Sequence, residues 1–143
     1  MKLQRRTLVM AGVAAAAGGA GALVATRRFQ LQPVMSEAEV AFWAGEFEGP
    51  NGERVRMADF RGQPLLVNFW ATWCPPCVEE LPMLNRFHEV QAAKGWKVLG
   101  LAVDQPSAVR SFLVKLPLNF PVGMAGFAGT ELSRSLGNPS GAL

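Results

Sequence analysis

The stretch FWATWCPPC, residues 69–77, decides the fold and holds the only two cysteines of the chain. It follows an apolar run and precedes a segment with the periodicity of an amphipathic helix. A helix that begins at Cys74 directs its unpaired N–H groups and the positive end of its dipole at that sulfur, which favours thiolate over thiol. This is the layout of a dithiol redox site. It predicts that Cys74 is the attacking sulfur and that Cys77, one helical turn later, is the resolving sulfur.

Other uses of a cysteine pair are a structural disulfide, half of a zinc site and two inert buried thiols. A zinc site takes four ligands, and the chain offers one histidine, His88, and no third cysteine. A structural bridge that closes so short a loop constrains the unfolded chain only weakly. We therefore favour the redox site and expect no metal ligands and no cofactor.

The charge of the chain is unevenly distributed. Of its 14 basic residues, five lie in residues 1–34, which hold no acid, and the other nine lie with all 11 acids in residues 35–143. The net positive charge therefore belongs to the first segment, and the rest has no basic excess with which to bind nucleic acid. A length of 143 residues, half of them hydrophobic, fits one packed domain plus this segment.

Residues 1–34 are predicted to be a signal peptide or membrane anchor with a connector, and residues 35–143 the folded domain. Residues 7–26 are uncharged, and twenty residues at ~1.5 Å each can span a bilayer, although many Ala and Gly make insertion weak. RRTLV at 5–9 resembles a twin-arginine export signal, and AGA at 20–22 is a candidate cleavage site. Inner-membrane anchor and cleaved peptide both remain open. Either way we expect a periplasmic or otherwise extracytoplasmic domain.

The domain alternates strand and helix patterns. The turn signal at 49–52 predicts a hairpin, and the apolar run at 65–70 predicts a buried parallel strand. A strand at 96–103 should lie beside it, parallel, because a helix intervenes. Further expected elements are helices at 74–93, 104–115 and 130–136, and a short strand at 119–122.

The helix that follows Cys74 should bury one apolar stripe. That stripe consists of Leu81, Leu84, Phe87 and either Val90 or Gln91. Pro82 lies inside the helix and predicts a kink.

Several short segments carry a family resemblance. They are NG at 51–52, RVRM at 54–57, DFRG at 59–62, PLLVNFW at 64–70 and LP at 81–82. With the Trp-Cys-x-x-Cys core they resemble the membrane-anchored thioredoxin-like proteins of the TlpA, ResA and DsbE type, over roughly residues 40–137. The resemblance implies an α/β thioredoxin-like fold, a central mixed sheet flanked by helices.

The resemblance also implies a function. It predicts an enzyme of cytochrome c biogenesis, a thiol-disulfide oxidoreductase that reduces disulfides of exported proteins such as apocytochrome c and is re-reduced by a membrane thiol reductase. Two alternatives stay open: a dithiol oxidase of the same mechanism, and a copper-handling assembly factor that uses Cys74 and Cys77 as ligands. The membrane is a partner only if residues 7–26 are retained, and nucleic acid is not a partner.

Further site residues follow from the resemblance. Glu80, three residues after Cys77 on the same side of the helix, matches a glutamate that this family places near its disulfide. It could accept the Cys77 proton if burial raises its pKa toward neutrality, whereas the alternative is a solvated acid like Glu79. Asn68 stands where thioredoxin carries a buried acid, and an amide cannot take a proton in this way.

Three residues around the cysteines are expected to form a docking surface for substrate. Trp73 should lie flat beside the sulfurs, while Trp70, at the strand end, should be core. Pro75 and Pro76 stiffen the loop and remove two N–H donors.

The end of the sequence departs from the family pattern. Relatives continue with a cis-proline that faces the dithiol, two antiparallel strands and a covering helix. Only four residues follow Pro139, too few for a strand, so we do not assign it as that cis-proline. We expect the sequence to be truncated after Leu143, with these strands and helix missing.

Overall fold

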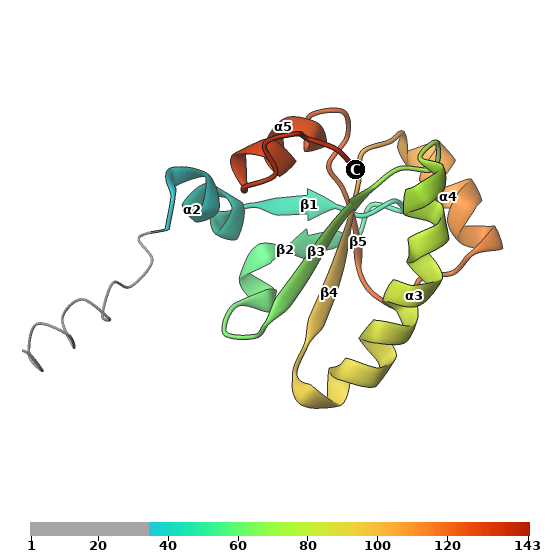
Figure 1. The fold of residues 1–143 in the computed structure, drawn as a ribbon, viewed down its shortest axis with the longest axis horizontal. Coiled ribbons are helices and arrows are strands. Elements are labelled where there is room, and N and C mark those ends of the chain that lie inside the picture. Colours follow the sequence, from blue (N-terminus) through green and yellow to red (C-terminus); the bar gives the residue numbers. More distant parts are fainter. Residues whose placement is uncertain (1–34) are drawn as a thin grey trace, which may run out of the picture. The chain divides into compact units, whose positions relative to one another are not determined.

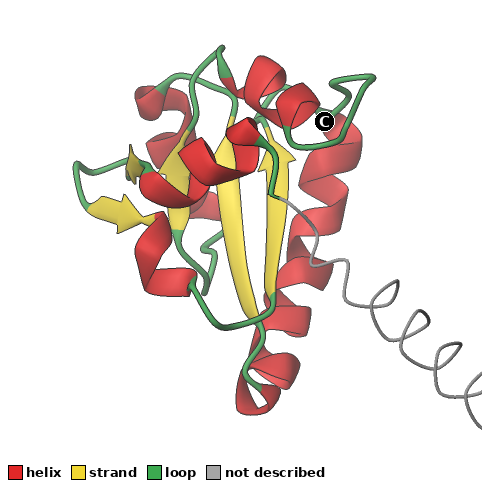
Figure 2. Cartoon of the chain, turned by 90° about the vertical axis from the view of Figure 1, so that its left-hand side faces the viewer, coloured by secondary structure: helices red, strands yellow, loops and turns green. Residues whose placement is uncertain are grey.

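The computed structural model describes residues 35–143, which form a five-stranded sheet in the order β2-β1-β5-β4-β3 (Figure 1). Helices pack on both faces of this sheet (Figure 2). The strands are β1 (Glu46–Glu48), β2 (Arg54–Arg56), β3 (Leu65–Trp70), β4 (Lys97–Ala102) and β5 (Val122–Met124). The helices are α2 (Glu37–Ala44), α3 (Pro75–Gln91), α4 (Pro106–Lys115) and α5 (Gly129–Ser135), with short 3-10 turns η1 (Met57–Phe60) and η2 (Ala92–Lys94).

The sheet is mixed, as predicted. β3 runs parallel to β4, with Leu65 opposite Lys97 and Trp70 opposite Ala102, and β4 runs parallel to β5. β1 is antiparallel to both β2 and β5, and the hairpin expected around 49–52 joins β1 to β2. The three parallel strands therefore end at one edge of the sheet, where the loops that follow them meet.

β4 is the most deeply buried strand of the described sheet, with every residue except Lys97 buried. Its side chains alternate between two cores: Val98 packs with the α3 and α4 residues, and Leu99 packs with α2 and η1. Gly100 leaves room for a close approach, because a Cβ atom there would lie 3.0 Å from Trp70 Nε1 and 3.1 Å from the Phe120 ring. Trp70 is fully buried, which confirms its predicted core position.

The prediction that β3 is a buried strand is wrong for most of its length. β3 pairs only with β4 and lies at the edge of the described sheet, and Trp70 is its one buried residue. A strand with one neighbour leaves a row of backbone groups and the flanks of its side chains uncovered. The apolar run at 65–70 does not reveal how many neighbours the strand has.

Two elements begin two or more residues later than expected. α4 begins at Pro106 rather than at 104, because Asp104 is bonded elsewhere, as described below. β5 covers Val122–Met124 rather than 119–122. Pro121 has no N–H to donate to the ladder, although its carbonyl accepts from Gly100 at 3.0 Å.

α3 has the predicted apolar stripe, and the structure decides between the two alternatives for its last position. Leu81 is fully buried, Leu84 and Phe87 pack against the same core, and Val90 is 58% exposed. Of the two alternatives for the last position, the half-buried one is therefore Gln91.

The export and anchor predictions for residues 1–34 lie outside the described residues. Within residues 35–143, no helix is both long enough and apolar enough to cross a membrane. The peptide bonds of this part of the chain are all trans, that of Pro139 included.

Candidate active site

Cys74 and Cys77 are joined by a disulfide at the amino end of α3, with their Cα atoms 5.3 Å apart. Cys74 is the N-cap residue, with extended backbone angles, and the helix begins at Pro75. Cys77 lies in the first turn. The helix start that the motif predicts is thus confirmed, and both sulfurs lie at the positive end of a helix of 17 residues.

The two prolines leave fewer N–H groups at this end of the helix. Pro75 and Pro76 carry no N–H, and the Val78 N–H donates to the Cys74 carbonyl at 3.1 Å. The first N–H that α3 can direct at the Cys74 sulfur is therefore that of Cys77. A thiolate at Cys74 is stabilised by few N–H donors, so other charges near the loop have a larger effect on its stability.

The cysteines are shielded, while their neighbours in sequence are open to solvent. Cys74 is 8% and Cys77 5% exposed, whereas Trp73 is 60% exposed and both prolines are exposed. The three predicted docking residues therefore all have free surface beside a nearly buried disulfide.

A carboxylate on the neighbouring strand end holds the loop that leads into Cys74. The Thr72 N–H donates to Asp104 Oδ2 at 2.8 Å, and the Thr72 hydroxyl donates to the same oxygen at 2.6 Å. The Gln105 N–H donates to Oδ1 at 2.7 Å. Asp104 is only 7% exposed, and it bridges the ends of two adjacent parallel strands.

Burial and hydrogen bonding act in opposite directions on this carboxyl. Burial raises the pKa of Asp104, but the hydrogen bonds from the Thr72 side chain, the Thr72 N–H and the Gln105 N–H together lower it below its ordinary 3.8. Each of these donors stabilises the charged form. Asp104 is therefore an anion at neutral pH, and no residue within 35–143 forms a salt bridge with it.

Sequence reasoning missed Asp104 and Thr72. The signal was present, because Asp104 follows a strand predicted to lie parallel to the strand before Thr72, and the carboxyl ends of parallel strands share one edge of the sheet. The helix pattern at 104–115, which begins at Asp104, hides this signal.

Glu80 does not meet the condition set for its predicted role. Its side chain is exposed on α3, as is that of Glu79, so the burial that the role required is absent. Asn68 is half-buried on β3, and its Nδ2 is enclosed without a hydrogen-bond partner in the described part of the chain.

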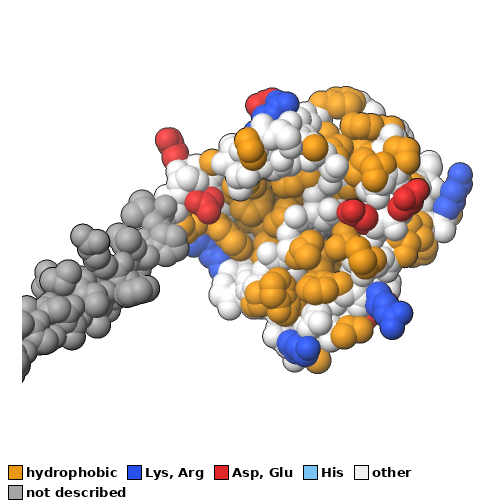
Figure 3. All heavy atoms as spheres, in the orientation of Figure 1, with side chains coloured by type: hydrophobic (Ala, Val, Ile, Leu, Met, Phe, Trp, Pro, Cys, Tyr) orange, Lys and Arg blue, Asp and Glu red, His pale blue; other side chains and the backbone are white. Residues whose placement is uncertain are grey.

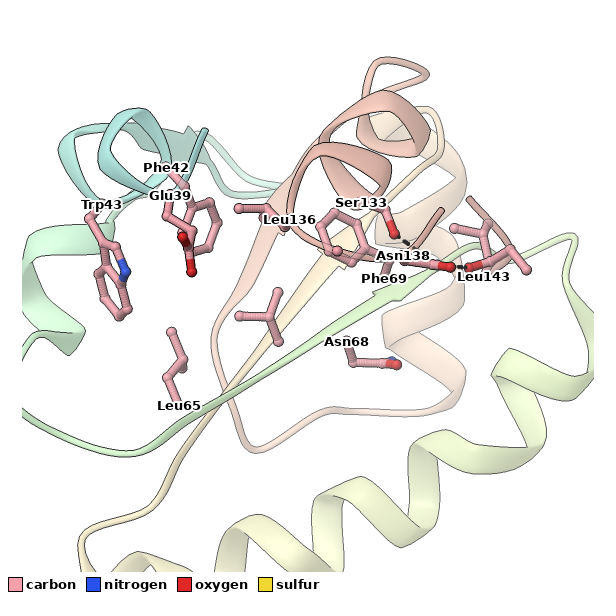
Figure 4. Close-up of a pocket in the computed structure, with 13 residues that line it drawn as sticks. Glu39, Phe42, Trp43, Leu65, Asn68, Phe69, Ser133, Leu136, Asn138 and Leu143 are labelled. Atoms are coloured by element: carbon pink, nitrogen blue, oxygen red, sulfur yellow. Dashed lines mark hydrogen bonds between the residues drawn. The ribbon is translucent and has the colours of Figure 1, made fainter. Parts of the chain in front are cut away.

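One pocket of the described residues lies away from the cysteines. It has a volume of about 640 Å³ and extends along the free edge of β3, between α2 and α5 (Figure 4). Phe42, Leu65, Phe69 and Leu136 line it, and neither cysteine does. Hydrophobic side chains gather on this side of the molecule (Figure 3). Within residues 35–143, no group of three or more His, Cys, Asp or Glu side chains is placed to hold a metal ion.

Comparison with known proteins finds relatives of this chain. The chain is 33% identical over 87 residues to the thiol-disulfide oxidoreductase ResA of Bacillus thuringiensis subsp. konkukian, covering 60% of this chain and 49% of that protein. It is 35% identical over 72 residues to ResA of Geobacillus kaustophilus, covering 50% of this chain and 41% of that protein. The chain thus spans about half the length of the curated relatives that it matches.

Solved structures resemble the fold. A thiol:disulfide interchange protein of the thioredoxin family from Chlorobium tepidum superposes with a TM-score of 0.59 at 27% identity, covering 66% of each chain. A thioredoxin-related protein from Neisseria meningitidis gives 0.61 at 26% identity, covering 68% of this chain and 74% of that one. The AhpC/TSA family matches residues 41–137, which include all five strands and both cysteines. This α/β chain, with its thioredoxin-like fold, belongs to the AhpC/TSA family.

Proposed function

We propose that this chain is a thiol-disulfide oxidoreductase whose redox centre is the Cys74–Cys77 pair. The observation that carries the proposal is the disulfide at the amino end of α3, with Cys74 as the N-cap residue. The names of the ResA relatives support the same chemistry.

The reduced pair exchanges two electrons with a substrate disulfide. The Cys74 thiolate attacks one substrate sulfur, forms a mixed disulfide and releases the other substrate sulfur as a thiolate. The Cys77 thiolate then attacks the Cys74 sulfur, which releases the first substrate sulfur and leaves the Cys74–Cys77 disulfide. The substrate gains two electrons and two protons, and the pair loses them.

The residues around the pair have supporting roles in this proposal. Trp73, Pro75 and Pro76 form the docking surface, for which their exposure beside the shielded cysteines is the support. Glu80 lies one helical turn after Cys77 and accepts the proton that Cys77 loses as the mixed disulfide resolves. Because Glu80 is exposed, water competes for this role and the contribution is modest.

The physiological setting of the reaction is proposed from the leader and from the resemblance to the TlpA, ResA and DsbE type. The domain works outside the cytoplasm, reduces disulfides of exported proteins such as apocytochrome c, and is returned to the dithiol by a membrane thiol reductase. A dithiol oxidase would use the same residues in reverse, and the measured reduction potential of the pair separates the two. Copper titration of the reduced protein tests the assembly-factor alternative.

Single-cysteine variants test the proposal. Replacing Cys77 with Ala removes the resolving sulfur, so Cys77→Ala incubated with a disulfide substrate should accumulate a mixed disulfide through Cys74, seen by mass spectrometry. Cys74→Ala, the matched control, should accumulate none. Absence of any mixed disulfide in Cys77→Ala, with wild-type protein inert toward the same substrate, would refute the proposed function.

A further inference from the structure

We propose that Asp104 is a positioning residue of the redox site, and that its negative charge, which Thr72 holds beside the loop at residues 71–74, shifts the redox equilibrium of the Cys74–Cys77 pair toward the disulfide. This inference rests on the proposed function and adds to it a residue outside the cysteine motif. It is carried by the three hydrogen bonds to the Asp104 carboxylate and by the burial of that group.

The Asp104 carboxylate lies close to Cys74. Asp104 Oδ2 lies 2.8 Å from the Thr72 nitrogen, and two residues of chain span at most about 7 Å. The carboxylate therefore lies within about 10 Å of the Cys74 backbone. The loop cannot extend away, because the Cys74 N–H donates to the Ala71 carbonyl at 3.3 Å and closes residues 71–74 into a turn.

Within the described residues Asp104 has hydrogen-bond donors but no cationic partner, and charges near a buried group are screened less than charges in water. The other acids near the pair, Glu79 and Glu80 on α3, are exposed and more strongly screened. Asp104 is therefore the acid placed to oppose a thiolate at Cys74.

The charge of Asp104 acts on the redox equilibrium between the cysteine pair and glutathione. The disulfide and two glutathione thiols convert to the dithiol and one glutathione disulfide, so two thiols and one disulfide stand on each side. A thiolate at Cys74 stabilises the dithiol side, and a nearby negative charge weakens that stabilisation. The Thr72 hydroxyl, by donating to Asp104, moderates the effect of its charge.

Two variants with opposite expected directions test this. Asp104→Asn removes the charge and should shift the glutathione equilibrium toward the dithiol by about threefold or more. Thr72→Val removes the hydroxyl and leaves the charge less compensated, so it should shift the equilibrium toward the disulfide, while Thr72→Ser should behave as wild type. Asp59→Asn removes an exposed charge from η1 as the matched control. The ratio of dithiol to disulfide is measured by thiol labelling and mass spectrometry of the full chain.

The outcomes separate this inference from the proposed function. Wild-type protein that does not exchange with glutathione would refute the proposed function itself. If the variants exchange with glutathione but Asp104→Asn and Thr72→Val keep the wild-type equilibrium constant, only the role of Asp104 is overturned. A shift of both variants in the same direction would also overturn it, because such a shift indicates that the loop has loosened. If Asp104→Asn does not fold, Thr72→Val decides: a shift toward the disulfide that Thr72→Ser does not show supports the inference, and no shift overturns it.

Discussion

Cys74 and Cys77 are chemically identical residues in different backbone positions. Cys74 is the N-cap residue of α3, where an anion is favoured, and Cys77 is a helical residue of the first turn whose own N–H can point at the Cys74 sulfur. The Asp104 carboxylate, bonded to Thr72, destabilises the same anion through its negative charge. The reactivity of Cys74 is therefore a balance between a helix end that lacks two N–H groups and a buried carboxylate.

Asp104 links the stability of the domain to pH. Its pKa is lowered in the folded protein below the ordinary 3.8, so the folded state binds this proton less tightly than the unfolded state. The stabilisation is present above pH 3.8 and is lost as pH falls through the lower folded pKa. Asp104→Asn should lower the unfolding free energy by about 1–3 kcal/mol at pH 7, and the difference should shrink in acid. Urea unfolding at several pH values measures this, and a difference that grows in acid would contradict it.

Glu80 can be tested against its neighbour. Glu80→Gln should slow the resolution of a mixed disulfide near neutral pH by about twofold to threefold, a small effect for general base catalysis because the side chain is exposed. Glu79→Gln, also exposed on α3, is the matched control. The rate is followed by quenching the reaction over time and analysing it by mass spectrometry. Equal rates in wild type and both variants would mean that Glu80 is an ordinary surface acid with no role in resolution.

The α3 helix positions the cysteines because one of its faces is fixed in the core. Leu81 is fully buried one turn after Cys77, whereas Met83 on the same helix is 65% exposed. Leu81→Ala should lower the unfolding free energy by about 2–5 kcal/mol, and Met83→Ala should change it by less than about 0.5 kcal/mol. Thermal or urea unfolding of the oxidised proteins distinguishes them. Equal losses in both variants would mean that α3 is not anchored through this face.

The elements themselves were largely predictable, because each follows from local pattern. The apolar run at 65–70, the amphipathic segment after Cys74 and the turn at 49–52 indicate a strand, a helix and a hairpin that the structure confirms. Ser36 caps α2 by accepting from the Glu39 N–H. What local pattern could not predict is pairing across the sheet: the edge position of β3 and the Asp104–Thr72 bonds depend on which strand ends become neighbours.

Within residues 35–143, β3 leaves one edge of the sheet unpaired. This strand has a single neighbour, and the pocket beside it is lined by apolar side chains, among them Phe42, Leu65 and Phe69 (Figure 4). Unpaired edges with apolar flanks are sites where chains associate.

We therefore expect residues 35–143, expressed alone, to self-associate with increasing concentration. Sedimentation velocity over a wide range of concentration measures this, with the sedimentation coefficient rising in wild-type protein. A Pro substitution at Val67 in β3 should reduce association by interrupting the edge, and circular dichroism checks that the variant remains folded. A monodisperse monomer at every concentration would show that the β3 edge is effectively covered.

The assignment of Cys74 as the attacking sulfur can be read from alkylation of the reduced protein. Iodoacetamide at pH 7, quenched over time and followed by peptide mass spectrometry, gives a separate rate for each cysteine. Because Cys74 lies at the N-cap and Cys77 within the helix, Cys74 should react about tenfold faster or more, since the amino end of a helix favours the thiolate that alkylation requires. Faster labelling of Cys77, or equal slow labelling of both, would contradict the proposed redox centre.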